Sequence, residues 1–331
     1  MIKGVVRMDS LVSVIMTAYN SERYIEEAIE SILSQTYQDW ELIIVEDGST
    51  DGTLQKIQKY SDSRIRLFCN DKNRGTLYSM QKAMNNVQGE YVAILDSDDV
   101  SMPQRIEKQV HILQIHPEIT LCATKVNNII NGKVKKIKYP QQLQPEKLRF
   151  MALFFNPYMV HSTIMFRKKE IENKHIRYER FSYCHDYYFV LQAAAVGRLF
   201  LVDEVLGSYR IHSDQKTNTL SKLKIRKEEL GARMCYVRKL RIFSKNEKRI
   251  LCKAISGELK SFSGFWILWH ALKKYAVFCG LGRQDHDLIQ QLYFDMLSQQ
   301  KESPAQFFFA LKTVTGNSAC GTVKQIRGWK I

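Results

Sequence analysis

The spacing of apolar residues over the first hundred positions alternates between two patterns. Compact apolar runs rich in β-branched residues predict buried strands, because such runs suit a sheet that is covered on both faces. Such a run occurs at 11–17 (LVSVIMT), and further strands are predicted at 40–45 (WELIIV), 65–68 and 91–95 (YVAIL). Apolar residues at helical spacing predict helices between them, and Ser21 and Pro103 suit the first turns of two of these helices. The predicted helices are 24–33, about 54–58, 77–87 and 103–116.

Strands separated by helices predict an α/β fold with a mostly parallel sheet. Ligands of such sheets bind outside the carboxyl ends of the strands. Three segments directly follow predicted strands and hold the unusual chemistry of the chain: 17–20 (TAYN), 46–51 (EDGSTD) and 96–99 (DSDD). Beyond residue 120 the pattern loosens, with a basic hairpin or loop at 133–138, and from Lys216 it predicts helices.

Carboxylates dominate the segment 96–99. Asp96 and Asp98 alternate at the end of an apolar strand. This arrangement presents oxygen ligands to a hard divalent cation and leaves coordination sites open for phosphate oxygens. The alternative is a solvated turn or a helix cap before Pro103, which the segment by itself satisfies equally well.

The other two strand-end segments carry groups suited to a nucleoside. The Asp47 carboxylate accepts a hydrogen bond from a base N–H such as uracil N3, and the Tyr19 ring offers a flat face for stacking. Each segment also has a purely structural interpretation. Gly48, Ser49 and Thr50 form a good strand-to-helix turn, and Tyr19 can simply cover the sheet edge.

Taken together, the three segments resemble glycosyltransferase family 2, the inverting enzymes of GT-A fold. The resemblance rests on VSVIMTAYN at 12–20, SILSQTYQDWELIIVEDGSTDGT at 31–53 and GEYVAILDSDD at 89–99, in the order and spacing of that family. It covers about residues 10–220. The chain is most similar to bacterial lipooligosaccharide and O-antigen transferases, including the β-1,3-N-acetylglucosaminyltransferase type. The resemblance implies a GT-A, Rossmann-like nucleotide-diphospho-sugar transferase fold with a basic, mainly α-helical C-terminal extension.

On the donor side, the resemblance implies a role for each matching residue. Nucleoside contacts fall on 17–19 and Asp47, a ribose or phosphate contact on Asp96, and a metal ion, Mn²⁺ or Mg²⁺, on Asp98. YRIH at 209–212 resembles the segment that closes over the diphosphate, with Arg210 as a cation and His212 as a second metal ligand. The implied donor-binding residues are Thr17, Ala18, Tyr19, Asp47, Arg74, Asp96, Ser97, Asp98 and Arg210.

On the acceptor side, two further matches carry the resemblance. HSTIMFR at 161–167 resembles the acceptor-side segment of the family and implies that His161 lies near the acceptor. His185-Asp186 stands where the family has a Glu-Asp pair whose Asp is the general base, so Asp186 is expected to take the proton of the attacking hydroxyl. His185 replaces the commoner Glu. The structural alternatives are buried histidines at 161 and 212 and a helix cap at 186.

Part of the family pattern is missing after the Asn-x-x-Gly turn that ends at Gly75. Met80 replaces the usual Arg, and Ala83 replaces the usual second Gly. A diphosphate or ribose contact is therefore absent, or it is supplied by Arg74 or Lys72.

Charge divides the chain into two regions. The net charge is +15, and 22 of the 49 Lys and Arg but only 8 of the 34 Asp and Glu lie from Lys216 onward. We therefore expect a catalytic domain at 1–218 and a basic helical region at 219–331. The basic region predicts an anionic partner, nucleic acid or a membrane surface. The segment 262–279 (FSGFWILWHALKKYAVFC) is too short to span a bilayer and suits either a membrane interface or packing on the catalytic domain.

The cellular location follows from weaker features. Seven widely spaced cysteines without a C-x-x-C pair argue against a disulfide framework and against a cysteine zinc site. Asp9 interrupts the N-terminus before any long apolar run, so no signal peptide is expected. Together with a lipid-linked acceptor, these features predict a cytoplasmic enzyme held peripherally on the inner face of the cytoplasmic membrane.

The predicted function is inverting transfer of a hexose or N-acetylhexosamine from a UDP-sugar. The acceptor is a saccharide or lipid-linked saccharide in the biosynthesis of bacterial lipooligosaccharide, O-antigen or capsule. The prediction includes an anionic membrane surface and a homodimer, and it excludes nucleic acid, because strand-end carboxylates without metal repel phosphates. The alternatives are a nucleotidyltransferase, which typically opens with a Gly-rich phosphate loop unlike TAYN, a catalytically inactive family member, and a basic binding protein.

Overall fold

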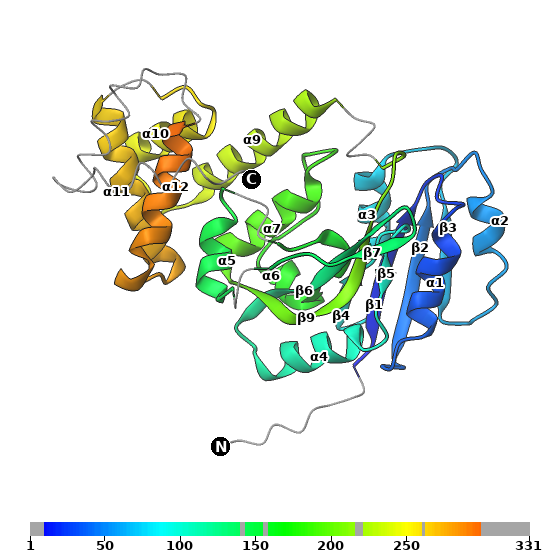
Figure 1. The fold of residues 1–331 in the computed structure, drawn as a ribbon. Coiled ribbons are helices and arrows are strands. Elements are labelled where there is room, and N and C mark those ends of the chain that lie inside the picture. Colours follow the sequence, from blue (N-terminus) through cyan, green and yellow to red (C-terminus); the bar gives the residue numbers. More distant parts are fainter. Residues whose placement is uncertain (1–9, 140–142, 155–157, 216–220, 260–261, 299–331) are drawn as a thin grey trace. The chain divides into compact units, whose positions relative to one another are not determined.

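The computed structural model describes residues 10–139, 143–154, 158–215, 221–259 and 262–298 (Figure 1). It divides into two compact units, Met1–Ala232 and Arg233–Ile331. The division falls inside helix α9 (Lys222–Lys239), whereas the charge pattern placed the boundary between 218 and 219. Residues 219–232 of the basic region therefore belong to the same compact unit as the sheet.

The first unit is built around one nine-stranded sheet. Its strands lie in the order β3-β2-β1-β4-β8-β6-β9-β5, and β7 pairs with β6. The neighbours β3, β2, β1 and β4 are parallel, β8 is antiparallel to β4 and β6, and β6 and β9 are parallel. The strands are β1 (Val12–Ala18), β2 (Trp40–Glu46), β3 (Ile65–Cys69), β4 (Tyr91–Ile94), β5 (Val100–Ser101), β6 (Ile119–Ile130), β7 (Lys133–Lys135), β8 (Met165–Arg167) and β9 (Arg198–Ile211).

Helices connect these strands and cover the sheet on both faces. α1 and α4 share one buried cluster with β1, β2 and β4. α3 packs against β1 and β2 but contributes nothing to that cluster, which assigns it to the opposite face. The helices of this unit are α1 (Ile25–Leu33), α2 (Thr53–Ile57), α3 (Thr76–Met84), α4 (Arg105–Ile115), α5 (Pro145–Met151), η1 (His161–Thr163), α6 (Lys168–Asn173) and α7 (His185–Val196).

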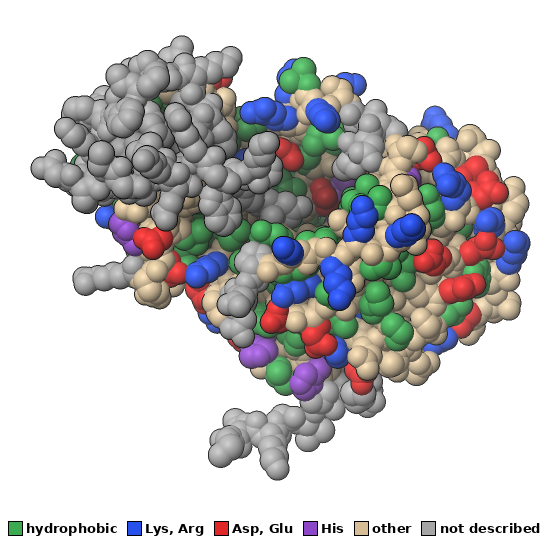
Figure 2. All heavy atoms as spheres, in the orientation of Figure 1, with side chains coloured by type: hydrophobic (Ala, Val, Ile, Leu, Met, Phe, Trp, Pro, Cys, Tyr) green, Lys and Arg blue, Asp and Glu red, His purple; other side chains and the backbone are tan. Residues whose placement is uncertain are grey.

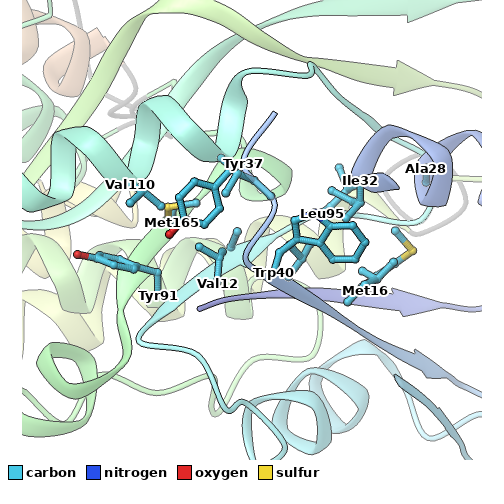
Figure 3. Packing of buried hydrophobic residues seen from close by; sticks show 14 of the residues in the cluster. Val12, Met16, Ala28, Ile32, Tyr37, Trp40, Tyr91, Leu95, Val110 and Met165 are labelled. Carbon is cyan, nitrogen blue, oxygen red and sulfur yellow. The ribbon is translucent and has the colours of Figure 1, made fainter. Parts of the chain in front are cut away.

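Alternate residues of β1 form the core beneath α1 and α4. Val12 and Met16 point to the same face and are fully buried, as expected for a period of two along a strand. Figure 3 shows Trp40 of β2 lying with Ile32 of α1 and with Leu95, which follows β4. This core fixes β1, β2 and β4 side by side, so the segments that follow their carboxyl ends meet at one edge of the sheet.

The sequence predicted the elements of the first hundred residues well. Each of the four predicted strands is present with both ends displaced by at most one residue. The predicted cap of α1 is wrong: Tyr24 precedes the helix and no side chain caps it. The Ser21 hydroxyl instead forms a hydrogen bond of 2.7 Å with the Ser97 hydroxyl. The basic segment at 133–138 begins as a hairpin in which Asn131 and Gly132, both with positive φ, join β6 to β7.

The surface of the first unit mixes charges of both signs. In the face that Figure 2 presents, acidic and basic side chains are interspersed over the described part of this unit. This distribution agrees with the nearly balanced charge of residues 1–215, where 27 basic residues meet 26 acidic ones.

The second unit contains helices. They are α10 (Lys245–Ile255), α11 (Phe262–Cys279), η2 (Arg283–Asp285) and α12 (His286–Ser298), which follow the end of α9. α11 packs against α10 and α12, and it buries Leu268, Trp269 and Leu272, while Trp266 stays 51% exposed. The apolar face of α11 therefore lies in the core of its own unit. None of the helices in the described residues is long and apolar enough to cross a membrane.

Candidate active site

A cavity of about 540 Å³ opens at the carboxyl ends of β1, β2 and β4. It lies where the strand order reverses, because the chain adds β2 and β3 on one side of β1 and β4 on the other. Its volume lies in the range of ordinary small-molecule sites. Eleven of the thirteen predicted site residues line it: Thr17, Ala18, Tyr19, Asp47, Asp96, Ser97, Asp98, His161, His185, Asp186 and His212.

Asp47 lies buried at the end of β2 and organises the adjoining loop. Its carboxylate accepts hydrogen bonds from the Asn70 side chain at 2.7 Å and from the backbone N–H groups of Arg74 and Gly75, both at 2.9 Å. Gly48 is required beside it, because its φ is +68° and a Cβ there would lie 2.5 Å from the Lys72 carbonyl carbon. Three donors leave one lone pair of the Asp47 carboxylate for a ligand in the cavity.

The acidic segment 96–99 joins two histidines from distant parts of the chain. Asp98 Oδ2 lies 3.0 Å from His212 Nε2, and Asp96 Oδ1 lies 3.3 Å from His161 Nδ1. The Asp96 backbone N–H also donates to the Ser162 hydroxyl at 2.9 Å. The tertiary structure thus pairs each of the two alternating carboxylates with an imidazole.

The electrostatics of this segment favour a bound cation. Burial raises the pKa of Asp98, and the neighbouring Asp96 carboxylate raises it further, although His212 opposes the shift. Burial, together with the Asp98 and Asp96 carboxylates, raises the pKa of Asp99 well above its usual range. Among the described residues, no three His, Cys, Asp or Glu side chains form a closed metal cluster. The Asp98 carboxylate and the His212 imidazole are donors of the kind that divalent cations bind, and metal binding by these two residues stays a prediction.

Two predicted donor-binding residues lie outside the cavity lining. The Arg210 guanidinium donates to the Asp98 carbonyl oxygen at 2.7 Å, pairs with Glu27 at 2.5 Å and stacks over the Tyr24 ring. Its backbone N–H donates to Asp99 at 2.7 Å. Arg210 therefore stabilises the acidic segment through Asp98 and Asp99 without lining the cavity.

Arg74 is held at the surface of its loop. Its guanidinium pairs with Asp71 at 3.2 Å and lies over the Tyr78 ring. Neither Arg74 nor Lys72 is among the residues that line the cavity. Where the family pattern has its usual Arg, the structure has Met80, which lies on the buried side of α3.

A buried aromatic group continues from Asp96 to the acceptor-side segment. His161 Nε2 lies 3.1 Å from the Tyr178 hydroxyl, and the Tyr178 ring stacks on Phe189 at 4.2 Å. Burial disfavours charge on His161, but the Asp96 carboxylate outweighs this effect and raises its pKa. The sequence carried no sign of Tyr178, because it lies in an irregular segment after α6.

Asp186 stands at the start of α7, on the cavity wall. Among the residues that the structure describes, its carboxylate makes no hydrogen bond or ion pair, so its oxygens remain available to a ligand. His185 beside it is buried and lies edge-on to the rings of His161 and Tyr178. The cavity wall also includes residues that no motif indicated: Arg23, Tyr24, Thr76, Tyr183, Asp214, Gln215 and Ile225.

A mostly parallel sheet with a polar cavity at the point where its strand order reverses is the arrangement of α/β nucleotide-binding proteins. A family model described as Glycosyl transferase family 2 matches residues 13–176. An uncharacterized glycosyltransferase of Haemophilus influenzae is 33% identical over 220 residues, which cover 63% of this chain and 68% of that protein. The chain belongs to glycosyltransferase family 2 and is a glycosyltransferase.

Further similarities lie in a curated relative and in solved structures. The UDP-Glc:alpha-D-GlcNAc-diphosphoundecaprenol beta-1,3-glucosyltransferase WfgD of Escherichia coli is 36% identical over 141 residues, 42% of this chain and 55% of WfgD. S. aureus TarS 1–349 in complex with UDP-GlcNAc is 17% identical with a TM-score of 0.60, covering 92% of this chain and 90% of that one. A Pyrobaculum calidifontis mannosyltransferase with GDP-Man and Mn²⁺ has a TM-score of 0.50 at 18% identity, covering 92% and 87%. These structures share the GT-A fold expected from the sequence.

Proposed function

We propose that this glycosyltransferase moves a hexose or N-acetylhexosamine from a UDP-sugar to a saccharide or lipid-linked saccharide during assembly of a bacterial surface polysaccharide. The observation that carries the proposal is the pairing of Asp98 with His212 in the same cavity as Asp47 and Asp186. Such a cavity suits a donor whose base, diphosphate and sugar need different partners. The names of WfgD and of the TarS complex support a UDP-linked donor and a lipid-linked acceptor. Family membership does not favour the nucleotidyltransferase and basic binding-protein alternatives.

In the proposed reaction, the acceptor hydroxyl oxygen attacks the anomeric carbon of the donor. A new glycosidic bond forms as the bond to the diphosphate breaks, the electron pair leaves with UDP, and the Asp186 carboxylate takes the hydroxyl proton. Attack opposite the leaving group inverts the anomeric centre. Tyr19, 37% exposed at the rim, provides a ring for the base, and Asp47 provides an acceptor for uracil N3.

A divalent cation, Mn²⁺ or Mg²⁺, fits this site. Asp98 and His212 would hold it, and when bound it supplies positive charge against the diphosphate leaving group. Arg210 acts indirectly in this scheme, because it fixes the Asp98 backbone and its guanidinium is occupied by Glu27.

Nucleotide binding tests the proposal directly. With Mn²⁺ present, we expect titration calorimetry to detect UDP and UDP-sugars but only weak binding of GDP and dTDP. We expect purified protein with a UDP-sugar and a lipid-linked saccharide to release UDP and lengthen the acceptor by one sugar. Absence of nucleotide binding with either metal would contradict the proposed donor, and preferential binding of GDP would contradict the role of Asp47.

We further propose that the enzyme binds peripherally to an anionic membrane surface through its second unit. Basic side chains gather along one side of α10 and the end of α9 and line a common hollow with a single acidic residue, Glu258. The apolar face of α11 is buried, so electrostatic attraction rather than insertion would drive this binding. The basic side chains are Arg238, Lys245, Lys248, Arg249 and Lys253.

Vesicle binding should therefore depend on this basic surface. We expect the triple variant Lys245→Gln, Lys248→Gln, Arg249→Gln to bind anionic vesicles about 100-fold more weakly, because each basic residue near such a surface contributes about 1 kcal/mol. The matched control removes three exposed lysines of the first unit: Lys133→Gln, Lys135→Gln, Lys136→Gln. Sedimentation with phosphatidylserine vesicles at physiological salt measures the difference. Equal binding by the two triple variants would reject the proposed surface.

A further inference from the structure

The segment that leads into α7 is held by a carboxylate from a different helix. Glu228 of α9 accepts hydrogen bonds from three consecutive backbone N–H groups, those of Ser182 at 3.2 Å, Tyr183 at 2.7 Å and Cys184 at 3.1 Å. Cys184 precedes α7, and no side chain of its own segment caps that helix. One carboxylate thus satisfies three adjacent donors where the positive end of a helix dipole favours negative charge.

The same face of α9 makes two further contacts with this segment. The Cys184 thiol donates to the Ile225 carbonyl oxygen at 3.7 Å. Gly231 allows close approach, because a Cβ there would lie 3.0 Å from the Phe181 ring. Ile225, Glu228 and Gly231 are three residues apart and therefore lie on one side of the helix. All of these contacts fall within the first compact unit.

Asp186 follows Cys184 by two residues, so the position of its carboxylate depends on where this segment is held. Ser182 and Tyr183, whose N–H groups Glu228 binds, also line the cavity. A displacement of about 1 Å at a reacting group costs on the order of a hundredfold in rate. The chain therefore uses a helix beyond the sheet to fix the residue that the proposed mechanism needs as its base.

We infer that Glu228 is a positioning residue for Asp186, and that the beginning of α9 is part of the catalytic apparatus. The inference rests on the proposed role of Asp186 in glycosyl transfer. Glu228 is not among the residues that line the cavity, and it acts through the backbone of 182–184. Hydrogen bonds to a charged carboxylate are stronger than hydrogen bonds between neutral groups. The three bonds from Glu228 therefore hold the backbone of 182–184 firmly, as a fixed position of Asp186 requires.

Kinetics of three variants test this inference. For Glu228→Ala we expect kcat to fall about 10- to 100-fold, with KM for the UDP-sugar and the affinity for UDP within threefold of wild type. Glu228→Asp keeps the charge with a shorter reach, and Glu228→Gln keeps one acceptor oxygen, so both should retain more activity than Ala. Glu229→Gln, which changes the neighbouring glutamate, is the matched control and should leave kcat unchanged.

Hydrogen exchange provides a measurement that does not depend on turnover. Amides of 182–187 should exchange at least tenfold faster in Glu228→Ala than in Glu229→Gln. Unchanged exchange, or a kcat within twofold of wild type, would overturn the inference. A third result would also overturn the inference: Glu228→Ala loses UDP affinity together with a large fall in unfolding temperature, and Glu228→Asp does not recover either property. Glu228 would then support the fold as a whole and not the position of Asp186. If the wild-type enzyme transferred sugar from no UDP-sugar, the proposed function would fail, and the exchange result would still decide whether Glu228 holds the segment.

Discussion

Asp186→Asn is expected to reduce turnover by about 10²- to 10⁴-fold, the usual contribution of a general base. Asn keeps the shape of the side chain but cannot take the proton of the acceptor hydroxyl. Asp186 lines the cavity from the start of α7, whereas Asp47, Asp96 and Asp98 come from the strand ends. The affinity for UDP, which we propose binds at the strand ends, should therefore change less than threefold. Steady-state kinetics combined with UDP calorimetry separates the two effects.

Asp39→Asn is a suitable control for this substitution. Asp39 is exposed and precedes β2, at the end of the strand opposite the cavity, so the same chemical change there should leave turnover intact. The role of Asp186 as a base would be contradicted if Asp186→Asn lost donor affinity and turnover to the same extent. It would also be contradicted if turnover fell less than tenfold.

Asp98→Ala is expected to abolish the part of UDP affinity that depends on a divalent cation. In Mn²⁺, UDP should bind at least tenfold more weakly to the variant than to wild type, because the cation loses the carboxylate that pairs with His212. In EDTA the difference in UDP affinity between wild type and Asp98→Ala should disappear or change sign. The variant removes a negative charge near the diphosphate, so its metal-free affinity should equal or exceed that of wild type.

The comparison in EDTA is the control, since it removes the metal without changing the fold. His212→Ala should reproduce the effect of Asp98→Ala more weakly, because one carboxylate ligand would remain. Equal enhancement of UDP binding by Mn²⁺ in wild type and in Asp98→Ala would assign the metal elsewhere. A loss of affinity that persists in EDTA would instead indicate that the substitution disturbs the nucleotide pocket itself.

Sequence patterns were sufficient for the parallel half of the sheet. The runs at β1, β2 and β4 are apolar enough to require burial on both faces, and the helical spacing between the strands leaves few topologies open. The same local logic located most of the cavity, because polar residues that directly follow such strands must meet at one edge. Asp47, Asp96 and Asp98 were identified in this way, and the structure brings them together.

Local patterns failed where a side chain had a choice of partners. Ser21 has the right residue type for a helix cap, yet its hydroxyl bonds to Ser97 from another strand end. Arg210 belongs to a segment that resembles a diphosphate clasp, yet Glu27 of α1 and the Asp98 carbonyl occupy its guanidinium. Arg74 likewise pairs with Asp71 in its own loop. A charged or hydroxyl group takes whichever partner the fold places nearest, and sequence spacing does not encode that distance.

The sequence by itself determined the α/β architecture, the family and the strand-end carboxylates, because these follow from short-range periodicity and contiguous motifs. Only the tertiary structure decided which groups meet over long separations. It paired Asp98 with His212, 114 residues away, and it paired His161 with both Asp96 and Tyr178. It also extended the catalytic unit into α9, where Glu228 holds the backbone ahead of Asp186, although charge alone had assigned that helix to a separate region. Contacts of this kind depend on how distant segments pack against one another, which local sequence propensity does not determine.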